Sequence, residues 1–150
     1  MAHTCNSIVI NAPYEKVFDI SNDIPRWTEL FGGEYKEATV LKKEGNKLTF
    51  RLTDDEGRSW QSFRLLFKEN NFAYAQKLPP EFPFTHMKII WLYTPAPPAE
   101  GPGIKMTWIQ DFQMDPKAKF TDAQVEEMIN KHSKENLEIF KRVIEKEAGQ

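Results

Sequence analysis

The stretch Ser-Trp-Gln-Ser-Phe-Arg at 59–64 places a hydroxyl group and a guanidinium group within a run that alternates like a β-strand. Successive side chains of a strand point to opposite faces, so Ser62 and Arg64 share a face with Trp60. Both side chains donate hydrogen bonds, so together they could hold an oxygen atom that gains negative charge. The opposite face carries Phe63 and is also apolar. Periodicity alone therefore leaves open whether Arg64 points into the protein or into solvent.

A buried guanidinium needs a carboxylate, a bound anion or several acceptors, and no acidic residue has a spacing that places it opposite Arg64. An inward Arg64 would face water or a ligand, which is typical of a binding site. Polar side chains also interrupt two other apolar patterns, at Gln110 in a strand-like run and at Asn136 in a helical stripe. An unsatisfied buried amide costs about 1–3 kcal/mol, so we expect Asn136 to face an internal space. His132 lies at the edge of the same stripe and fits solvent equally well.

The motifs of several large enzyme classes are absent from the sequence. It has no glycine-rich phosphate loop, no dinucleotide fingerprint and no nucleophile elbow. The three histidines show no metal-ligand spacing, and the single cysteine, Cys5, allows neither a zinc site nor an internal disulfide. We therefore expect chemistry without a cofactor or a metal. Arg, Ser, Tyr, Asn, Gln and water suit proton transfer, enol stabilisation and dehydration.

The composition indicates a single globular domain spanning residues 1–150. The net charge of −2 gives no indication of nucleic-acid binding, and no apolar run is long enough to span a membrane. The N-terminus lacks the features of a secretory signal, and one cysteine fits a reducing cytoplasm. Aromatic residues make up 13% of the chain, which is consistent with a ring-rich core or with a cavity walled by rings.

The order of expected elements indicates the fold class. A strand at 4–11 precedes two short helices, one capped by Asn11 and one ending at Gly32–Gly33. About six strands joined by tight turns follow between 35 and 114, and one long helix capped by Thr121 or Asp122 ends the chain. Consecutive hairpins predict an antiparallel sheet, so the class is α+β. We expect a helix-grip fold, in which a curved sheet of about seven strands wraps around the long helix and leaves an interior cavity.

An ordered set of motifs adds a resemblance to a known family. It consists of the segment NSIVINAPYEKVFDISNDIPRWTELFGGEYKEATVL, W-x-S-x-R ending at Arg64, PF-x-x-M-x-x-x-W ending at Trp91, M-x-W-x-Q-D-F-x-M ending at Met114, and N-L-E starting at Asn136. Together they resemble the bacterial aromatic polyketide aromatase/cyclases of the tetracenomycin and spore-pigment type. These are single-domain members of the START-like (Bet v 1-like) superfamily.

The resemblance implies a reaction and its partners. Such enzymes receive a linear poly-β-ketone on an acyl carrier protein, made by a ketosynthase/chain-length-factor pair. They direct an aldol closure of the first ring, of the C9–C14 type, followed by dehydration to an aromatic ring. The resemblance implies catalytic roles for Arg64, Ser62 and Tyr35. It implies substrate contacts by Trp27, Phe31, Glu34, Trp60, Phe84, Met87, Trp91, Trp108, Gln110 and Asn136.

Two other functions fit the same fold. One is a non-catalytic carrier of a lipid or another hydrophobic molecule, with Arg64 holding the ligand's carboxylate. A stress-response or co-chaperone relative is a weaker alternative, because it would need no polar residues in the interior.

Overall fold

The computed structural model describes residues 1–149 and contains the expected elements in the expected order. These are β1 (Ala2–Ile10), α1 (Tyr14–Ser21), η1 (Ile24–Arg26), α2 (Trp27–Leu30), β2 (Tyr35–Glu44), β3 (Lys47–Asp54), β4 (Ser59–Phe67), η2 (Lys68–Asn70), β5 (Phe72–Lys77), β6 (Phe84–Pro95), η3 (Pro98–Glu100), β7 (Ile104–Met114) and α3 (Asp122–Ala148). The segments η1, η2 and η3 are single turns of 3-10 helix.

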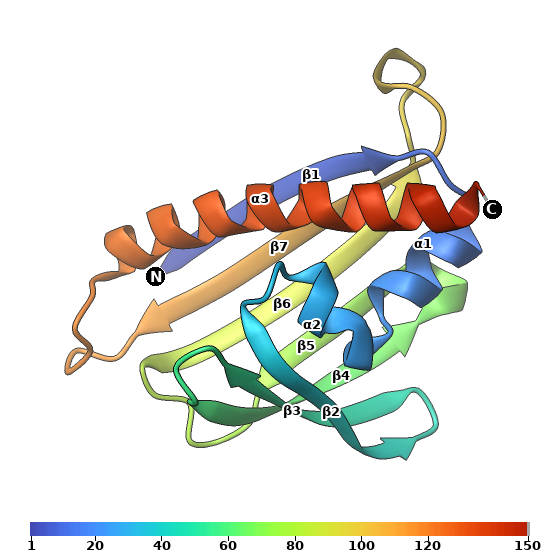
Figure 1. Ribbon diagram of the computed structural model, residues 1–150. Helices are drawn as coiled ribbons and strands as arrows, with labels where there is room; N and C mark the ends of the chain where they lie inside the picture. Colours follow the sequence, from blue (N-terminus) through green and yellow to red (C-terminus); the bar gives the residue numbers. More distant parts are fainter. Residues whose placement is uncertain (150) are drawn as a thin grey trace.

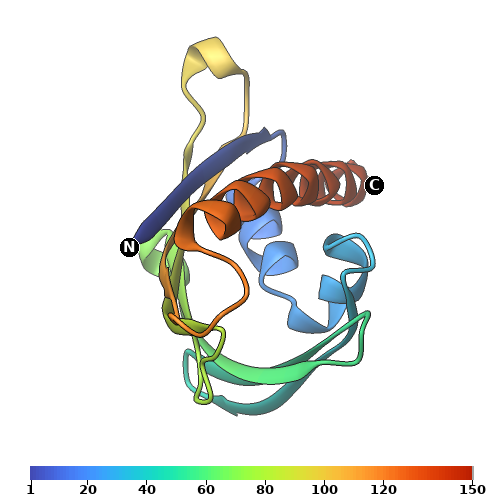
Figure 2. The same cartoon turned by 90° about the vertical axis from the view of Figure 1, so that its left-hand side faces the viewer.

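The seven strands form one antiparallel sheet in the order β1-β7-β6-β5-β4-β3-β2. The sheet curves, and α3 runs along its concave side next to β1, while α1 and α2 close one end (Figure 1). In a view nearly along α3, the sheet curves around the helices (Figure 2). The predicted helix-grip fold is confirmed.

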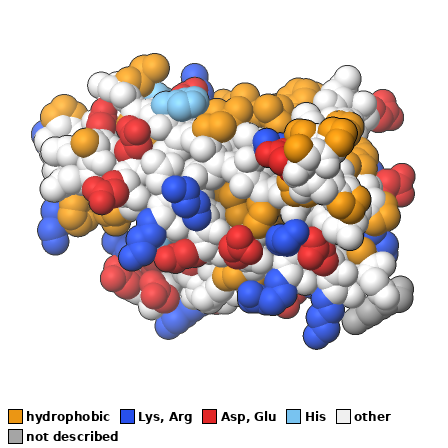
Figure 3. All heavy atoms as spheres, turned by 90° about the horizontal axis from the view of Figure 1, so that it is seen from above, with side chains coloured by type: hydrophobic (Ala, Val, Ile, Leu, Met, Phe, Trp, Pro, Cys, Tyr) orange, Lys and Arg blue, Asp and Glu red, His pale blue; other side chains and the backbone are white. Residues whose placement is uncertain are grey.

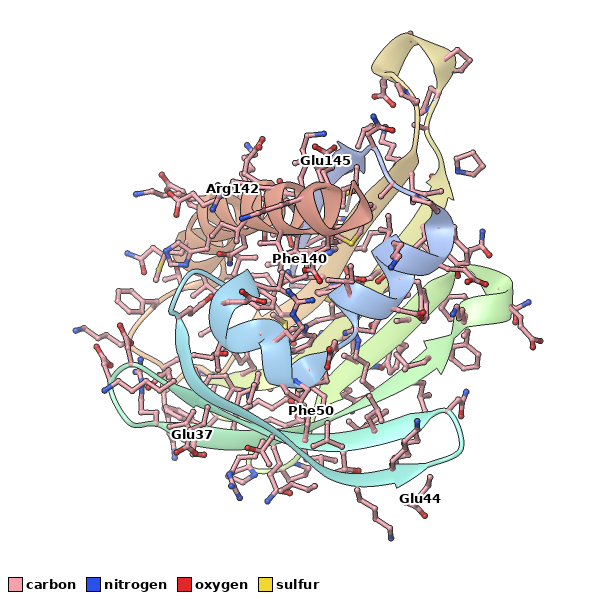
Figure 4. All side chains as sticks on the ribbon, turned by 45° about the vertical axis from the view of Figure 1, so that its right-hand side comes forward. Glu37, Glu44, Phe50, Phe140, Arg142 and Glu145 are labelled. Carbon is pink, nitrogen blue, oxygen red and sulfur yellow. The ribbon has the colours of Figure 1, made fainter. Side chains whose placement is uncertain are left out.

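The strand register decides which side chains meet on the concave face. One row crosses six strands: Leu48, Arg64, Ala75, Ile89, Gln110 and Thr4. The next row towards α1 pairs Ala73 with Trp91 and Trp91 with Trp108. Figure 4 shows Phe50 on β3 and Phe140 on α3 facing the interior from opposite sides. The predicted alternation of inward and outward residues is therefore confirmed on β3, β6 and β7.

The helix α3 is fixed at both ends. Thr121 forms a capping box with Gln124, which satisfies two backbone N–H groups that a helix start otherwise leaves free. Near the other end, Glu147 accepts two hydrogen bonds from Arg26 of η1. The predicted cap at Asn11 is wrong, because α1 begins after Pro13 without a side-chain cap. The backbone N–H of Asn11 instead donates to Glu145 on α3, at 2.8 Å.

The surface is ordinary for a protein of this composition. Acidic and basic side chains are interspersed over the face shown in Figure 3. Within residues 1–149, no helix is both long enough and apolar enough to cross a membrane.

Candidate functional site

Arg64 lies on the inner face of β4 and is 1% exposed. Its Nε donates a hydrogen bond of 2.7 Å to Oδ1 of Asn22, the residue that ends α1. Its guanidinium carbon lies 4.1 Å from the ring centroid of Trp91 and 5.4 Å from that of Trp27. The structure thus resolves the alternative left by periodicity, since Arg64 points inward and stacks on an indole.

Asn22 belongs to a buried polar network that holds this arginine. Its Nδ2 donates to the Tyr93 hydroxyl at 3.0 Å and to the carbonyl of Phe18 at 2.8 Å. The Tyr93 hydroxyl also lies 2.8 Å from Oγ of Ser21. Because Ser21 is the last residue of α1, Asn22 follows it directly and Tyr93 lies on β6, the network ties the end of this helix to the sheet beneath Arg64. An amide, rather than a carboxylate, is therefore the direct partner of the arginine.

The environment of Arg64 is unfavourable for its charge. Burial lowers its pKa to about 10, and the nearby Tyr93 hydroxyl only partly opposes this effect. The arginine therefore stays charged at neutral pH, but burying this charge lowers the free energy of unfolding. Its Nη2 is enclosed and has no hydrogen-bond partner within residues 1–149, and the same holds for Nε1 of Trp108. With Oγ1 of Thr4, three polar atoms of the concave face have no partner within residues 1–149, and such atoms are available to bind an oxygen of a ligand.

Small residues on β5 make room for the arginine. Ala75 is the cross-strand neighbour of Arg64, and Ala73 is that of Trp91. Both alanines are buried, so the long side chain can lie across β5 and reach the indole on β6. A larger residue at either position would occupy this space.

Four of the predicted wall residues gather in one aromatic cluster. The Trp91 and Trp108 rings stack with 4.4 Å between centroids and 12° between planes. Trp27 lies 5.8 Å from Trp91, and Phe31 lies 5.7 Å from Trp108. The ring of Phe140 on α3 packs edge-on against the rings of Trp91 and Trp108. The rings fill the space above Arg64 by packing on one another, so a pocket at this end of the interior stays a prediction.

The other predicted residues lie towards the opposite end of the interior, where side chains are only half-buried. This group consists of Glu34, Tyr35, Trp60, Phe84, Met87 and Asn136. The rings of Tyr35 and Trp60 meet at 6.0 Å, and Phe84 packs edge-on against Phe112. Ser62 and Gln110 are buried on the inner face between the two groups, and Ser62 sits opposite Phe50 and Lys77 in the register. The structure therefore divides the predicted site into a closed part and a part that solvent reaches.

Burial changes the acidity of two neighbouring residues at the half-buried end. Burial raises the pKa of the Glu34 carboxyl, although His132 opposes this effect and Asn136 donates a hydrogen bond of 3.4 Å to it. Burial and the carboxylates of Glu34 and Asp54 raise the pKa of Tyr35. Tyr35 therefore keeps its proton and is better suited to donate a hydrogen bond than to transfer a proton.

Lys77 is a polar residue of the concave face that the sequence analysis missed. It ends β5, and its Nζ donates a hydrogen bond of 3.0 Å to the carbonyl of Phe82. The same nitrogen lies 5.7 Å from the Trp60 ring centroid and 5.8 Å from that of Phe84. Burial lowers its pKa. The alternation Ala73, Ala75, Lys77 carried this signal, because the first two residues lie on the same face as Lys77.

The comparisons with known proteins agree with the fold and with the motifs. Residues 10–141 match the family described as polyketide cyclase / dehydrase and lipid transport. A "Putative polyketide cyclase" of Streptomyces cyaneus is 39% identical over 148 residues, which cover 95% of this chain and 93% of that protein. The chain belongs to the polyketide cyclase/dehydrase family.

Two solved structures confirm the architecture. The ZhuI aromatase/cyclase from Streptomyces sp. R1128 superposes with a TM-score of 0.80 at 18% identity, covering 95% of this chain and 93% of that one. A START superfamily protein from Mycobacterium smegmatis has a TM-score of 0.65 at 15% identity, covering 100% and 99% of the two chains. The resemblance drawn from the sequence is thus confirmed for the family and for the helix-grip fold.

Proposed function

We propose that the protein is a cofactor-independent aromatase/cyclase that closes and aromatises the first ring of a carrier-bound linear poly-β-ketone. In this proposal residues 1–150 act as one domain, an acyl carrier protein delivers the chain, and a ketosynthase/chain-length-factor pair supplies it. The observation that carries the proposal is the buried Arg64, whose Nη2 has no acceptor within residues 1–149, in a chain of this family.

The chemistry that such a donor favours is enolate stabilisation. A methylene between two ketones is already acidic, so the closure needs a fixed donor at the oxygen that becomes negative more than it needs a strong base. Arg64 would supply this donor from Nη2, because Asn22 occupies Nε. Ser62 is two residues away on the same face, about 7 Å along the strand, and would hold a second oxygen or a water molecule.

Regiochemistry is the harder task, because a long polyketone can close in many ways. We propose that the rings of Trp27, Phe31, Trp91 and Trp108 separate enough to admit the ketone oxygen that Arg64 holds, so that the reacting bend lies over Ser62, between Arg64 and Trp60. Trp60, Phe84 and Met87, with the polar groups of Gln110 and Asn136, would guide the remaining chain. Fixing the two reacting carbons near each other can lower the barrier by several kcal/mol, about 7–11 kcal/mol in the best oriented systems.

The test is product analysis with a reconstituted minimal synthase. We expect first-ring aromatic products when the protein is present, and a shift to misfolded shunt products with the variant Arg64→Ala. Circular dichroism should show that this variant is folded. A product profile that does not respond to the protein would contradict the assignment.

A carrier of hydrophobic acids is the second candidate. It is favoured by the lipid-transport part of the family description and by the unpaired charge of Arg64, which a ligand carboxylate would neutralise. Tight binding of a fatty acid, lost in Arg64→Ala, together with an unchanged product profile would favour this function over catalysis.

A further inference from the structure

Cyclisation followed by dehydration requires four proton transfers, and the residues assigned so far are poor at them. A proton must leave the methylene, one must reach the new alkoxide, a second carbon-bound proton must leave, and the departing hydroxyl must be protonated. Arg64 has a pKa of about 10 and stays charged, and Tyr35 has a raised pKa. Proton transfer is fastest for groups whose pKa values lie near the working pH, so other residues are needed.

We propose that Glu34, beside Asn136, and Lys77, beside Trp60, act as an acid–base pair at the half-buried end of the interior and carry these proton transfers. This inference rests on the proposed function, because it assigns the protons of that reaction. It names a catalytic role for Glu34 beyond substrate contact and adds Lys77 to the site.

The geometry places both groups beside residues that are predicted to contact the substrate. Lys77 contacts the ring directly, since its Nζ is 5.7 Å from the centroid, and it faces Ser62 across the strand register. Glu34 accepts a hydrogen bond of 3.4 Å from Asn136 on α3, and the next residue in the chain, Tyr35, meets the Trp60 ring at 6.0 Å. Both side chains are half-buried, so a ligand or water can reach them.

Neither group is neutralised by a partner. No ion pair within residues 1–149 includes Glu34 or Lys77. The charged and titratable groups that influence Glu34 are His132 on α3 with Asp54 and Asp55 at the end of β3, and the one that influences Lys77 is Glu81 in the following loop. Structural charges at a surface are usually paired or solvated, whereas these two are half-buried, unpaired and adjacent to the predicted substrate path.

The two environments shift the pKa values in opposite directions. Burial raises the pKa of Glu34, which makes its carboxylate a stronger base. Burial lowers the pKa of Lys77, which makes its ammonium group a stronger acid. Opposed shifts of this kind in one site distinguish the base from the acid.

Over ring closure and dehydration together, each proton that one residue takes up is given back. In ring closure, the Glu34 carboxylate takes a methylene proton, the enolate carbon attacks a ketone carbon, and the ketone oxygen takes a proton from the Lys77 ammonium. A carbon–carbon bond and a hydroxyl group result. In dehydration, the neutral Lys77 amine takes the second carbon-bound proton, and the protonated Glu34 gives its proton to the leaving hydroxyl. One water molecule is lost, and both residues return to their starting states.

The experiment measures the ratio of first-ring aromatic product to spontaneous shunt product at each pH, because this ratio cancels the synthase's own rate. The test variants are Glu34→Gln, which keeps the size of the side chain, and Lys77→Arg, which keeps the positive charge; neither new side chain can exchange a proton near neutral pH. The controls are Glu37→Gln and Lys47→Arg. Glu37 is exposed on the outer face of β2, as Figure 4 shows, and Lys47 lies over the outward ring of Phe63 at 5.1 Å. Thermal unfolding would check that all four variants are folded.

For the native chain we expect a bell-shaped dependence, which falls at low pH as Glu34 is protonated and at high pH as Lys77 loses its proton. Glu34→Gln should abolish the acid limb and Lys77→Arg the alkaline limb, and each should lower the ratio about 100-fold or more. The controls should leave it unchanged. If the native protein is active and both test variants keep its product ratio and both limbs of its pH dependence, the acid–base pair is refuted while the proposed function stands. A native protein that forms no first-ring product would overturn the proposed function, and the pair with it.

Discussion

Replacing Arg64 with methionine should change the free energy of unfolding by no more than about 2 kcal/mol, even though the change removes the residue proposed to stabilise the enolate. The guanidinium is 1% exposed, has an amide rather than a carboxylate as its partner, and keeps Nη2 without an acceptor. A methionine ends about where Nε of the arginine lies, so it keeps the apolar part of the side chain inside the protein but loses the guanidinium stacked on Trp91. Buried charges replaced by apolar residues of similar volume are often neutral or stabilising by about 1–4 kcal/mol.

The magnitude follows from the shifted acidity. A pKa lowered from 12.5 to about 10 corresponds to a cost of about 3 kcal/mol for keeping the arginine charged in the folded state. Because the folded value lies below the unfolded one, this cost is present in full at neutral pH and disappears as pH rises from about 10 towards 12.5. Methionine removes the cost but also loses the hydrogen bond to Asn22, which is worth about 1.5–3 kcal/mol. Methionine also loses the stacking of the guanidinium on Trp91, which is worth about 0.5–2 kcal/mol, so the net change lies between about 1 kcal/mol in favour of the variant and about 2 kcal/mol against it.

Urea denaturation would measure this change, and Arg64→Ala provides the contrast. Alanine also removes the charge but leaves a cavity beside the tryptophans, so it should lower the free energy of unfolding by about 2–4 kcal/mol relative to Arg64→Met. A double-mutant cycle with Asn22→Ala should give a coupling of about 1.5–3 kcal/mol, because Asn22→Ala leaves an unpaired charged Nε only when the arginine is present. A loss of more than 2 kcal/mol in Arg64→Met, with no coupling to Asn22, would refute this account of the site.

Two further substitutions test the surroundings of the site. Tyr93→Phe removes the hydroxyl group to which Asn22 donates, so it should lower the free energy of unfolding by about 1–3 kcal/mol, and a change below 0.5 kcal/mol in urea denaturation would contradict the network. Gly103→Ala would place a methyl carbon 2.1 Å from the carbonyl oxygen of Ile10 at a φ of +114°, so it should cost at least about 2 kcal/mol in the same measurement. Gly57→Ala, at a φ of +84° with open space around it, should lower the free energy of unfolding only through backbone strain, by about 1 kcal/mol. An equal loss of stability in the two variants would contradict the predicted clash at Gly103.

The sequence predicted the fold because local patterns determine it. The alternation on β3, β6 and β7 predicted the inward residues correctly. Thr121 predicted the start of α3, and the glycines after α2 predicted the end of that helix. The same patterns could not decide the side on which Arg64 lies, because both faces of β4 carry apolar residues. That decision depended on comparing several strands and on the motif resemblance.

The partners of Arg64 could not be predicted in the same way. Asn22 lies at the end of α1 and meets the arginine only because α1 folds across the open end of the sheet. The sequence carries no signal for a contact between separate elements, so it could not predict that Asn22 meets Arg64. Lys77 is different, because its strand alternates clearly. It could have been found by applying the inward pattern of the neighbouring strands to β5.

The packed rings above Arg64 also have a consequence for substrate recognition. Under the proposed function, an incoming ketone oxygen can reach the enclosed Nη2 only in a conformation where Trp27 or Trp91 has moved aside. The apparent dissociation constant then equals the intrinsic one divided by the population of this open conformation, so a population of about 1% weakens binding about 100-fold. Substitutions that pack the rings more tightly should therefore make the fold more stable and the substrate bind less well.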